Sequence, residues 1–224
     1  MNIPTTTRLL RATPRLAFQL RAVSTLSNNP HIRLQQYAFK DPNTPSSYIL
    51  TFLSHEPPTS SIAIGSTTKL PPIPSSFKEN PKFLPILQSV IAENAHADPF
   101  IQSQAAVMIS SAGASFFQAM RRQQTGSSGA SDQGGYGSAG RGGFVHVFDQ
   151  RRMPEYGRIP DPEDIFGSVE VDGQGQFVDG HGRYEASGTY RIVTNDGILG
   201  LSDFLREKLV ERLKLQEAAE RHKK

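Results

Sequence analysis

The polar stretch whose residue types could do the most lies between residues 151 and 160. Arg151, Arg152 and Arg158 flank Tyr156 in a stretch with neither the two-residue period of a strand nor the 3.6-residue period of a helix. Arg and Tyr are enriched among the residues that contribute most to binding at protein interfaces. These four residues are therefore our candidate contacts for a partner. The alternative is structural, because the arginines could pair with nearby acids and the tyrosine could cover the sheet core.

No other pattern in the chain predicts a chemical site. Residues 135–140 match the G-x-G-x-x-G pattern of dinucleotide-binding loops, but they lie in Gly- and Ser-rich sequence and not between a strand and a helix. Arg141 begins a single Arg-Gly-Gly-Phe run, which is too short for the repeated stacking of RNA-binding segments. Among the acids of the C-terminal part, those that precede Gly at 172, 179 and 196 are explained by turns, and those at 161, 163 and 164 by a helix start. We predict no catalytic, cofactor-binding or metal-binding residues.

A second function stays open as an alternative. The chain has no Cys, which excludes a disulfide scaffold, a Cys-ligated zinc site and a thiol nucleophile. His146 lies between Val145 and Val147 in an alternating run and is interpreted as a packed, hydrogen-bonded side chain. The alternative is a small enzyme or ligand-binding domain with its site in the C-terminal sheet, near His146, Tyr156, Tyr190 and the adjacent acids.

The first 26 residues predict a mitochondrial presequence. They contain four arginines, no acid and many hydroxyl side chains, with apolar residues between the arginines. A cationic, weakly amphipathic helix of this kind is drawn to anionic membranes and to a negative-inside potential. We expect processing near residues 23–27 and a mitochondrial location, in the matrix or at the inner membrane. A basic tail without structure and a plastid transit peptide are the alternatives.

Removing residues 1–26 changes the charge of the chain. The full sequence of 224 residues has 24 Lys and Arg, 21 Asp and Glu, and a formal net charge of +3. Without the first 26 residues, 20 basic residues stand against 21 acidic ones, and residues 144–224 have a net charge of −3. A basic patch is the usual electrostatic footprint of nucleic-acid binding. We therefore do not expect a nucleic-acid partner.

Residues 27–80 are rich in Pro and Ser and predict an extended region. Two short apolar runs, at 48–53 and 61–65, predict strands that the turn segment 54–60 could join as an irregular hairpin. Residues 70–74 contain three prolines. Because proline cannot donate to a strand ladder, they predict a connector outside the sheet interior.

Residues 81–122 predict a helical region. Asn80-Pro81 and Asp98-Pro99 each combine a capping side chain with proline at the first helical position. An apolar stripe at spacings of three and four follows the first signal and consists of Phe83, Leu84, Leu87, Val90 and Ile91. The uncharged run from Phe100 to Met120 is long enough to cross a bilayer, but polar side chains interrupt it. We expect a helix packed against protein, with a membrane span as the alternative.

Residues 123–143 are rich in Gly and Ser and predict a flexible linker, and residues 144–224 predict a folded C-terminal domain. Alternating runs at 144–148 and 188–194, with turn signals at short intervals between them, predict an antiparallel meander. A helix follows Ser202. Its core stripe consists of Leu205, Leu209 and Leu213. We therefore predict an α+β protein, with a small antiparallel β-meander packed with a C-terminal helix and preceded by a helical and partly disordered N-terminal region.

These features together predict a non-enzymatic mitochondrial accessory or assembly protein that docks onto a larger complex. Extended segments that bury little of themselves are typical of chains that lie across the surface of a partner. The respiratory chain and the mitochondrial ribosome are the two candidate hosts. We accordingly expect other mitochondrial proteins as partners.

Overall fold

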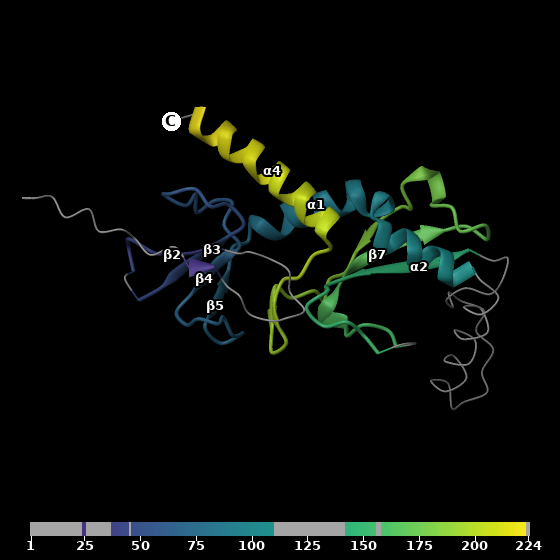
Figure 1. The fold of residues 1–224 in the computed structure, drawn as a ribbon, viewed down its shortest axis with the longest axis horizontal. Helices are drawn as coiled ribbons and strands as arrows, with labels where there is room; N and C mark the ends of the chain where they lie inside the picture. The colour runs from purple at the N-terminus through teal and green to yellow at the C-terminus, as the bar shows by residue number, and fades with distance from the viewer. Residues whose placement is uncertain (1–23, 26–36, 45, 110–141, 156–157, 223–224) are drawn as a thin grey trace, which may run out of the picture.

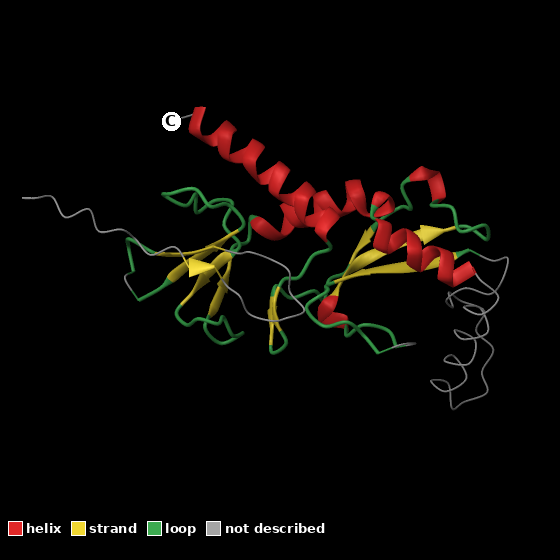
Figure 2. Cartoon of the chain, in the orientation of Figure 1, coloured by secondary structure: helices red, strands yellow, loops and turns green. Residues whose placement is uncertain are grey.

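The computed structural model describes residues 24–25, 37–44, 46–109, 142–155 and 158–222 (Figure 1). Most of the predicted presequence and most of the predicted Gly/Ser-rich linker therefore lie outside the described residues. The described residues form helices and several antiparallel sheets, with a long helix near the C-terminus (Figure 2). The predicted α+β fold class is thereby confirmed.

The residues before the first helix form an antiparallel sheet. Its strands lie in sequence order and are β1 (Ser24–Thr25), β2 (Tyr37–Lys40), β3 (Tyr48–Thr51), β4 (Gly65–Thr67) and β5 (Phe77–Glu79). Ala38, Phe39 and Leu50 are buried, so this sheet contributes side chains to the core. The region predicted as extended, with strands at 48–53 and 61–65, thus forms a sheet; β3 lies within the first predicted strand. β1 overlaps the end of the predicted presequence.

The predicted strand at 61–65 is largely wrong, because β4 begins only at Gly65. Ile62, Ala63 and Ile64 are buried but lie in the turn before the strand. The side-chain amide of Asn80 lies within hydrogen-bond distance of the carbonyls of Ser60, Ser61 and Ala63. The Asn80 side chain therefore bonds carbonyls of residues 61 and 63, which the alternating apolar pattern had predicted to pair with a neighbouring strand. The connector predicted at 70–74 does lie outside the strands, between β4 and β5.

Two helices follow. The first begins at Phe83, with Lys82 at its cap position and no side-chain cap hydrogen bond, so the helix start predicted at Asn80-Pro81 is two residues too early. α1 (Phe83–Asn94) buries Phe83, Leu87, Val90 and Ile91, which are four of the five predicted stripe residues. A 3-10 turn at Ala95–Ala97 leads to α2 (Pro99–Ile109). Asp98 accepts a hydrogen bond from the N–H of Phe100 at 2.8 Å and so caps α2 as predicted. In the described residues no helix has the length and apolarity of a membrane span, and the run to Met120 continues beyond them.

A second sheet lies in the C-terminal part of the chain. It consists of β6 (Gly143–Phe148), β7 (Ile165–Val171) and β8 (Glu185–Ala186), and a separate hairpin pairs β9 (Val193–Thr194) with β10 (Gly197–Ile198). The predicted strand at 144–148 is confirmed. The strand predicted at 188–194 is wrong for most of its length, because only β9 is paired within it.

The last helix, α4 (Asp203–His222), begins at the predicted cap. Ser202 accepts a hydrogen bond from the N–H of Leu205 at 3.1 Å, and the three predicted leucines are buried. The helix continues to His222. Its end is held because Thr59 donates to Glu217 at 3.1 Å and Ser61 donates to Glu220.

One hydrophobic core joins both parts of the chain. α1 and α4 pack against each other, and Figure 1 shows them crossing between the two sheets. The core cluster includes Leu50 and Phe83 from one side of the predicted linker and Val169 and Leu209 from the other. The core therefore does not divide at the compositional boundary near residue 143. This arrangement fixes the ends of the long loop between β6 and β7, where the candidate partner contacts lie.

Candidate functional site

The candidate partner contacts lie in the segment 149–164 that connects β6 to β7, here called the β6–β7 loop. The structure divides them. Arg151 is 1% exposed, so the prediction that it contacts a partner is wrong, and the structural alternative holds for this residue. Arg152 and Arg158 lie at the surface, with side chains 61% and 75% exposed. Tyr156 lies outside the described residues.

Arg151 can be buried because each nitrogen of its guanidinium has a hydrogen-bond acceptor. Nε donates to Asp164 Oδ1 at 2.8 Å, and a terminal nitrogen lies 3.3 Å from Asp149 Oδ2. The remaining bonds go to four backbone carbonyls, those of Glu163, Arg191, Ile192 and Gly197. The rigid fork of donors on Arg suits such a site better than the single ammonium of Lys.

Two of these carbonyls lie in the segment 188–194 that was predicted as a strand. Arg191 O and Ile192 O accept from Arg151 at 2.7 and 3.1 Å. Ile192 O also accepts from Leu199 N–H at 2.9 Å, whereas Arg191 N–H donates to Glu163 O at 3.0 Å, outside the β9–β10 pair. The guanidinium thus ties the β6–β7 loop to the β9–β10 hairpin.

Asp149 is the second buried charge of this cluster. Its carboxylate accepts from the N–H groups of Arg151 and Gly200 at 2.8 Å each, and from the Tyr190 hydroxyl at 2.9 Å. Burial raises the pKa of Asp149 to about 7, against the opposing effect of Arg151 and of these donors. Burial likewise raises the pKa of Asp164, while Arg151 lowers it.

Tyr190 completes what we call the Arg151 cluster, which consists of Asp149, Arg151, Asp164 and Tyr190. Burial raises the pKa of Tyr190 far above its ordinary range, so the phenol stays protonated and donates to Asp149. Its ring lies 5.5 Å from the Arg151 guanidinium and 4.4 Å from the Phe166 ring. Every polar group of the cluster is bonded within it or to nearby backbone, so its described contacts are those of a structural anchor.

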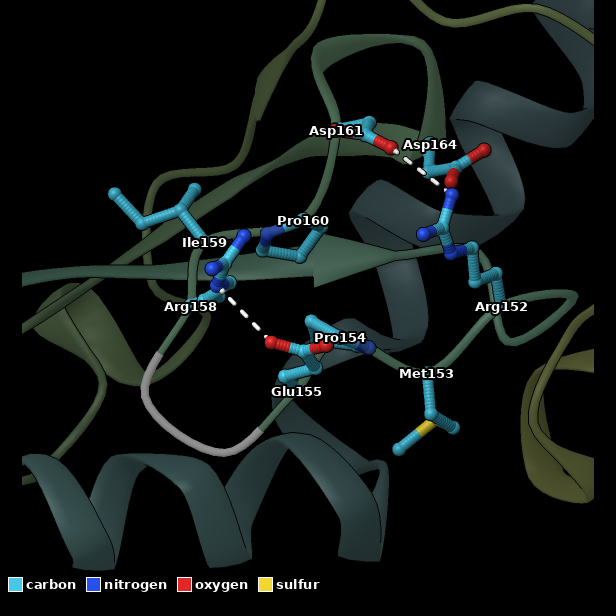
Figure 3. A pocket seen from close by; sticks show the side chains of 9 residues that line it. All are labelled: Arg152, Met153, Pro154, Glu155, Arg158, Ile159, Pro160, Asp161 and Asp164. Carbon is cyan, nitrogen blue, oxygen red and sulfur yellow. Dashed lines mark ion pairs between the residues drawn. The ribbon is translucent and has the colours of Figure 1, made fainter.

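The exposed part of the β6–β7 loop surrounds a small hollow of about 110 Å³. Arg158 pairs with Glu155 at 3.1 Å, and Arg152 lies 3.8 Å from Asp161 (Figure 3). Arg152 also lies 3.6 Å from Asp196. Both arginines therefore pair with nearby acids, as the structural alternative predicts. Their side chains are nevertheless exposed and accessible to a partner.

Two apolar side chains at this hollow were missed by sequence reasoning. Met153 is 52% exposed and Ile159 is 42% exposed, although both are large and hydrophobic. Each is followed by proline, Pro154 and Pro160. A residue before proline is held extended, and proline cannot join a ladder, so each pair places an apolar side chain outside regular structure. That signal was present in the sequence.

This surface has the chemistry of a protein contact. Met and Arg are enriched at protein interfaces, where apolar contacts are surrounded by a polar rim. The hollow is well below the roughly 300–1,000 Å³ that is typical of small-molecule sites. It can accommodate a protruding side chain of a partner. We call Arg152, Met153, Arg158 and Ile159 the loop surface.

Of the three residues named for the alternative site, His146 and Tyr190 are described, and they bond to different partners. Tyr190 donates its hydroxyl to Asp149 in the interior, whereas His146 Nδ1 lies 2.9 Å from Ser168 Oγ on the neighbouring strand. Burial lowers the pKa of His146, which favours its neutral form. Within the described ranges, no three His, Cys, Asp or Glu side chains are placed to hold one metal ion.

Comparison with known proteins adds no name to this arrangement. No family model, curated protein or solved structure matches the chain.

Proposed function

We propose that this chain is a non-enzymatic mitochondrial accessory or assembly protein that docks onto a larger complex through the loop surface. The observation that carries the proposal is the exposure of Met153 and Ile159 on a loop whose ends are held by buried groups. Large apolar side chains exposed beside charged side chains are typical of an interaction site. The respiratory chain and the mitochondrial ribosome remain the candidate hosts.

The anchoring of the loop supports a role in binding. Arg151 bonds to Asp164 near the end of the loop and to the adjacent hairpin, so both ends of the loop are held in place before any partner arrives. A preorganised loop loses less conformational entropy on association than a free one does. The same contacts that remove Arg151 from the surface therefore favour binding by its neighbour Arg152.

The mitochondrial part of the proposal rests on residues 1–26, with their four arginines and no acid. A fusion of the full chain to a fluorescent protein should enter mitochondria, and a fusion that begins at residue 27 should stay in the cytosol. Equal import of both fusions would contradict the assignment of these residues.

The docking part is tested on the tagged full chain, by blue-native separation of gently solubilised mitochondria. We expect the wild-type chain to migrate in an assembly far larger than its own 24.6 kDa. The double variant Met153→Glu/Ile159→Glu should migrate as a free protein, because two carboxylates would have to be desolvated at the contact. Leu215→Glu is the matched control, since Leu215 is 63% exposed on α4.

Circular dichroism melting of the purified variants keeps the experiment decisive, because both should unfold at the wild-type temperature. Wild-type protein that migrates as a free monomer would overturn the proposal. A double variant that stays folded and remains in the large assembly would overturn it as well.

A further inference from the structure

β5 forms the outer edge of the five-stranded sheet, and its described partner is β4. The N–H of Asn80 donates to the carbonyl of Ile64 at 3.1 Å, so every second residue from 76 to 80 directs its backbone groups toward β4. These groups alternate in direction along an antiparallel strand. The backbone of Phe77 and Glu79 therefore points to the outer side.

The outer edge is open to a further strand. Phe77 N–H donates to Ile73 O at 3.1 Å, whereas Phe77 C=O and both backbone groups of Glu79 have no hydrogen-bond partner in the described part of the chain. Unpaired groups at a sheet edge are a template for pairing with another chain. Addition of an extended peptide to such an edge is a recurrent mode of recognition.

Two hollows border this edge and share Glu79 in their walls; together they are called the β5 groove. The first, of about 630 Å³, is mainly apolar and is lined by Pro81, Leu84, Pro85, Gln88, Ala186 and Ser187 besides Glu79. The second, of about 380 Å³, is more polar and includes Phe77, Glu163 and Arg191. An extended segment paired with β5 could therefore place side chains in both hollows.

The charges of the β5 groove favour a cationic occupant. Arg191 pairs with Glu163 at 3.3 Å, so these two charges compensate each other. Glu79 forms no ion pair within 4.0 Å in the described ranges, although it lies in the electrostatic field of Arg191. Glu79 is exposed; partial desolvation raises its pKa and Arg191 lowers it. A Lys or Arg from a partner could reach this carboxylate and pair with it across the strands.

We propose that the β5 groove binds an extended segment of a partner protein, with a basic side chain beside Glu79 and an apolar side chain in the hollow at Leu84. Backbone pairing with Phe77 and Glu79 supplies the orientation, and the cross-strand ion pair supplies selectivity for sign. This surface uses none of the residues of the loop surface. The inference therefore goes beyond the proposed function and can fail independently of it.

The probe is a set of synthetic heptapeptides that alternate Val and Thr, with Lys, Gln or Glu at the central position. Binding to the purified full chain is measured by fluorescence anisotropy. We expect the Lys peptide to bind at least about tenfold more tightly than the Glu peptide, because like charges at a contact are strongly unfavourable. Glu79→Lys should reverse this order, and Glu79→Gln should remove the difference.

Two controls separate edge pairing from general charge attraction. Glu207→Lys makes the same charge change on the exposed face of α4 and should leave all affinities unchanged. N-methylation of single peptide amides should weaken binding at every second position, since only alternate N–H groups face β5.

Several results would overturn the inference. These are no binding of any peptide at millimolar concentration, binding of the Lys peptide that Glu79→Lys does not change, and N-methylation without a two-residue period. A dimer of the chain that Glu79→Lys disrupts would assign the edge to a second copy instead and would equally overturn it.

Discussion

The carboxylate of Asp98 and the hydroxyl of Ser202 join the N-termini of α2 and α4. Ser202 donates to Asp98 Oδ2, although the two residues are 104 positions apart. Each also caps its own helix, because Asp98 Oδ1 accepts from Phe100 N–H and Ser202 Oγ accepts from Leu205 N–H. Both side chains are buried. One polar contact therefore satisfies two helix starts and fixes them side by side.

The single variants Asp98→Ala and Ser202→Ala should each lower the free energy of unfolding by about 1–2 kcal/mol, the usual effect of losing an N-cap. The double variant should lose less than the sum, because the two side chains act as one unit. Urea denaturation of all four proteins measures the coupling. Ser103→Ala, which removes an exposed hydroxyl on α2, is the control and should change little.

Arg151→Met should lower the free energy of unfolding by about 3–5 kcal/mol, because Asp149 and Asp164 would lose their shared buried cation. Arg152→Met removes the same charge from a side chain that is 61% exposed and should change stability by less than about 0.5 kcal/mol. Chemical denaturation gives both values. Equal losses from the two variants would show that the Arg151 cluster does not anchor the loop.

Asp149 should titrate near pH 7 in the folded protein, as observed through its carboxyl ¹³C shift. Between its ordinary pKa of 3.8 and about 7, the folded state then holds a proton that the unfolded chain has lost. The stabilising effect of this group is thus complete below pH 3.8 and is lost as the pH rises through 7.

The consequence for stability is measured against Asp149→Asn. Between pH 5 and 7 the wild type should lose up to about 1.4 kcal/mol per pH unit more than this variant. Both proteins contain His96 and His146, so the contributions of these two histidines cancel in the comparison. Burial lowers their pKa values, so their contribution to stability changes with pH in the opposite direction to that of Asp149. Parallel curves for the two proteins would contradict the raised pKa.

Gly200→Ala should destabilise the fold by about 1–3 kcal/mol, because the added methyl group would lie 2.7 Å from Arg151 N and 2.9 Å from Asp149 Oδ1. Nothing lies within 4 Å of the corresponding position at Gly188, so Gly188→Ala is the matched control and should be close to neutral. Thermal melting compares the two. A melting temperature for Gly200→Ala equal to that of the control would contradict the close packing of Gly200 against Arg151 and Asp149.

Patterns with a clear period were predictable from the sequence. The leucine stripe of α4 and the stripe of α1 are both buried as their spacing indicated, because burial of one helix face depends on local periodicity. The Asp98 and Ser202 caps were also identified, since capping is decided within three or four residues.

Features that depend on distant partners were not predictable. The buried role of Arg151 requires carbonyls from residues 40, 41 and 46 positions away. The turn at Ile62 and Ala63 depends on the amide of Asn80. In the candidate site, Arg152 and Arg158 were identified from their residue types. Met153 and Ile159 were missed, because their only signal is the proline that follows each of them.

The bonds from Thr59 to Glu217 and from Ser61 to Glu220 have a consequence for the order of folding, because they connect positions 158 and 159 residues apart. A chain that leaves a ribosome or an import channel N-terminus first cannot form them until its final helix has emerged. Until then, the apolar face of α1 that packs on α4 stays uncovered. Closure of the core is therefore coupled to the emergence of α4, and a truncation before residue 203 would leave α1 exposed to aggregation.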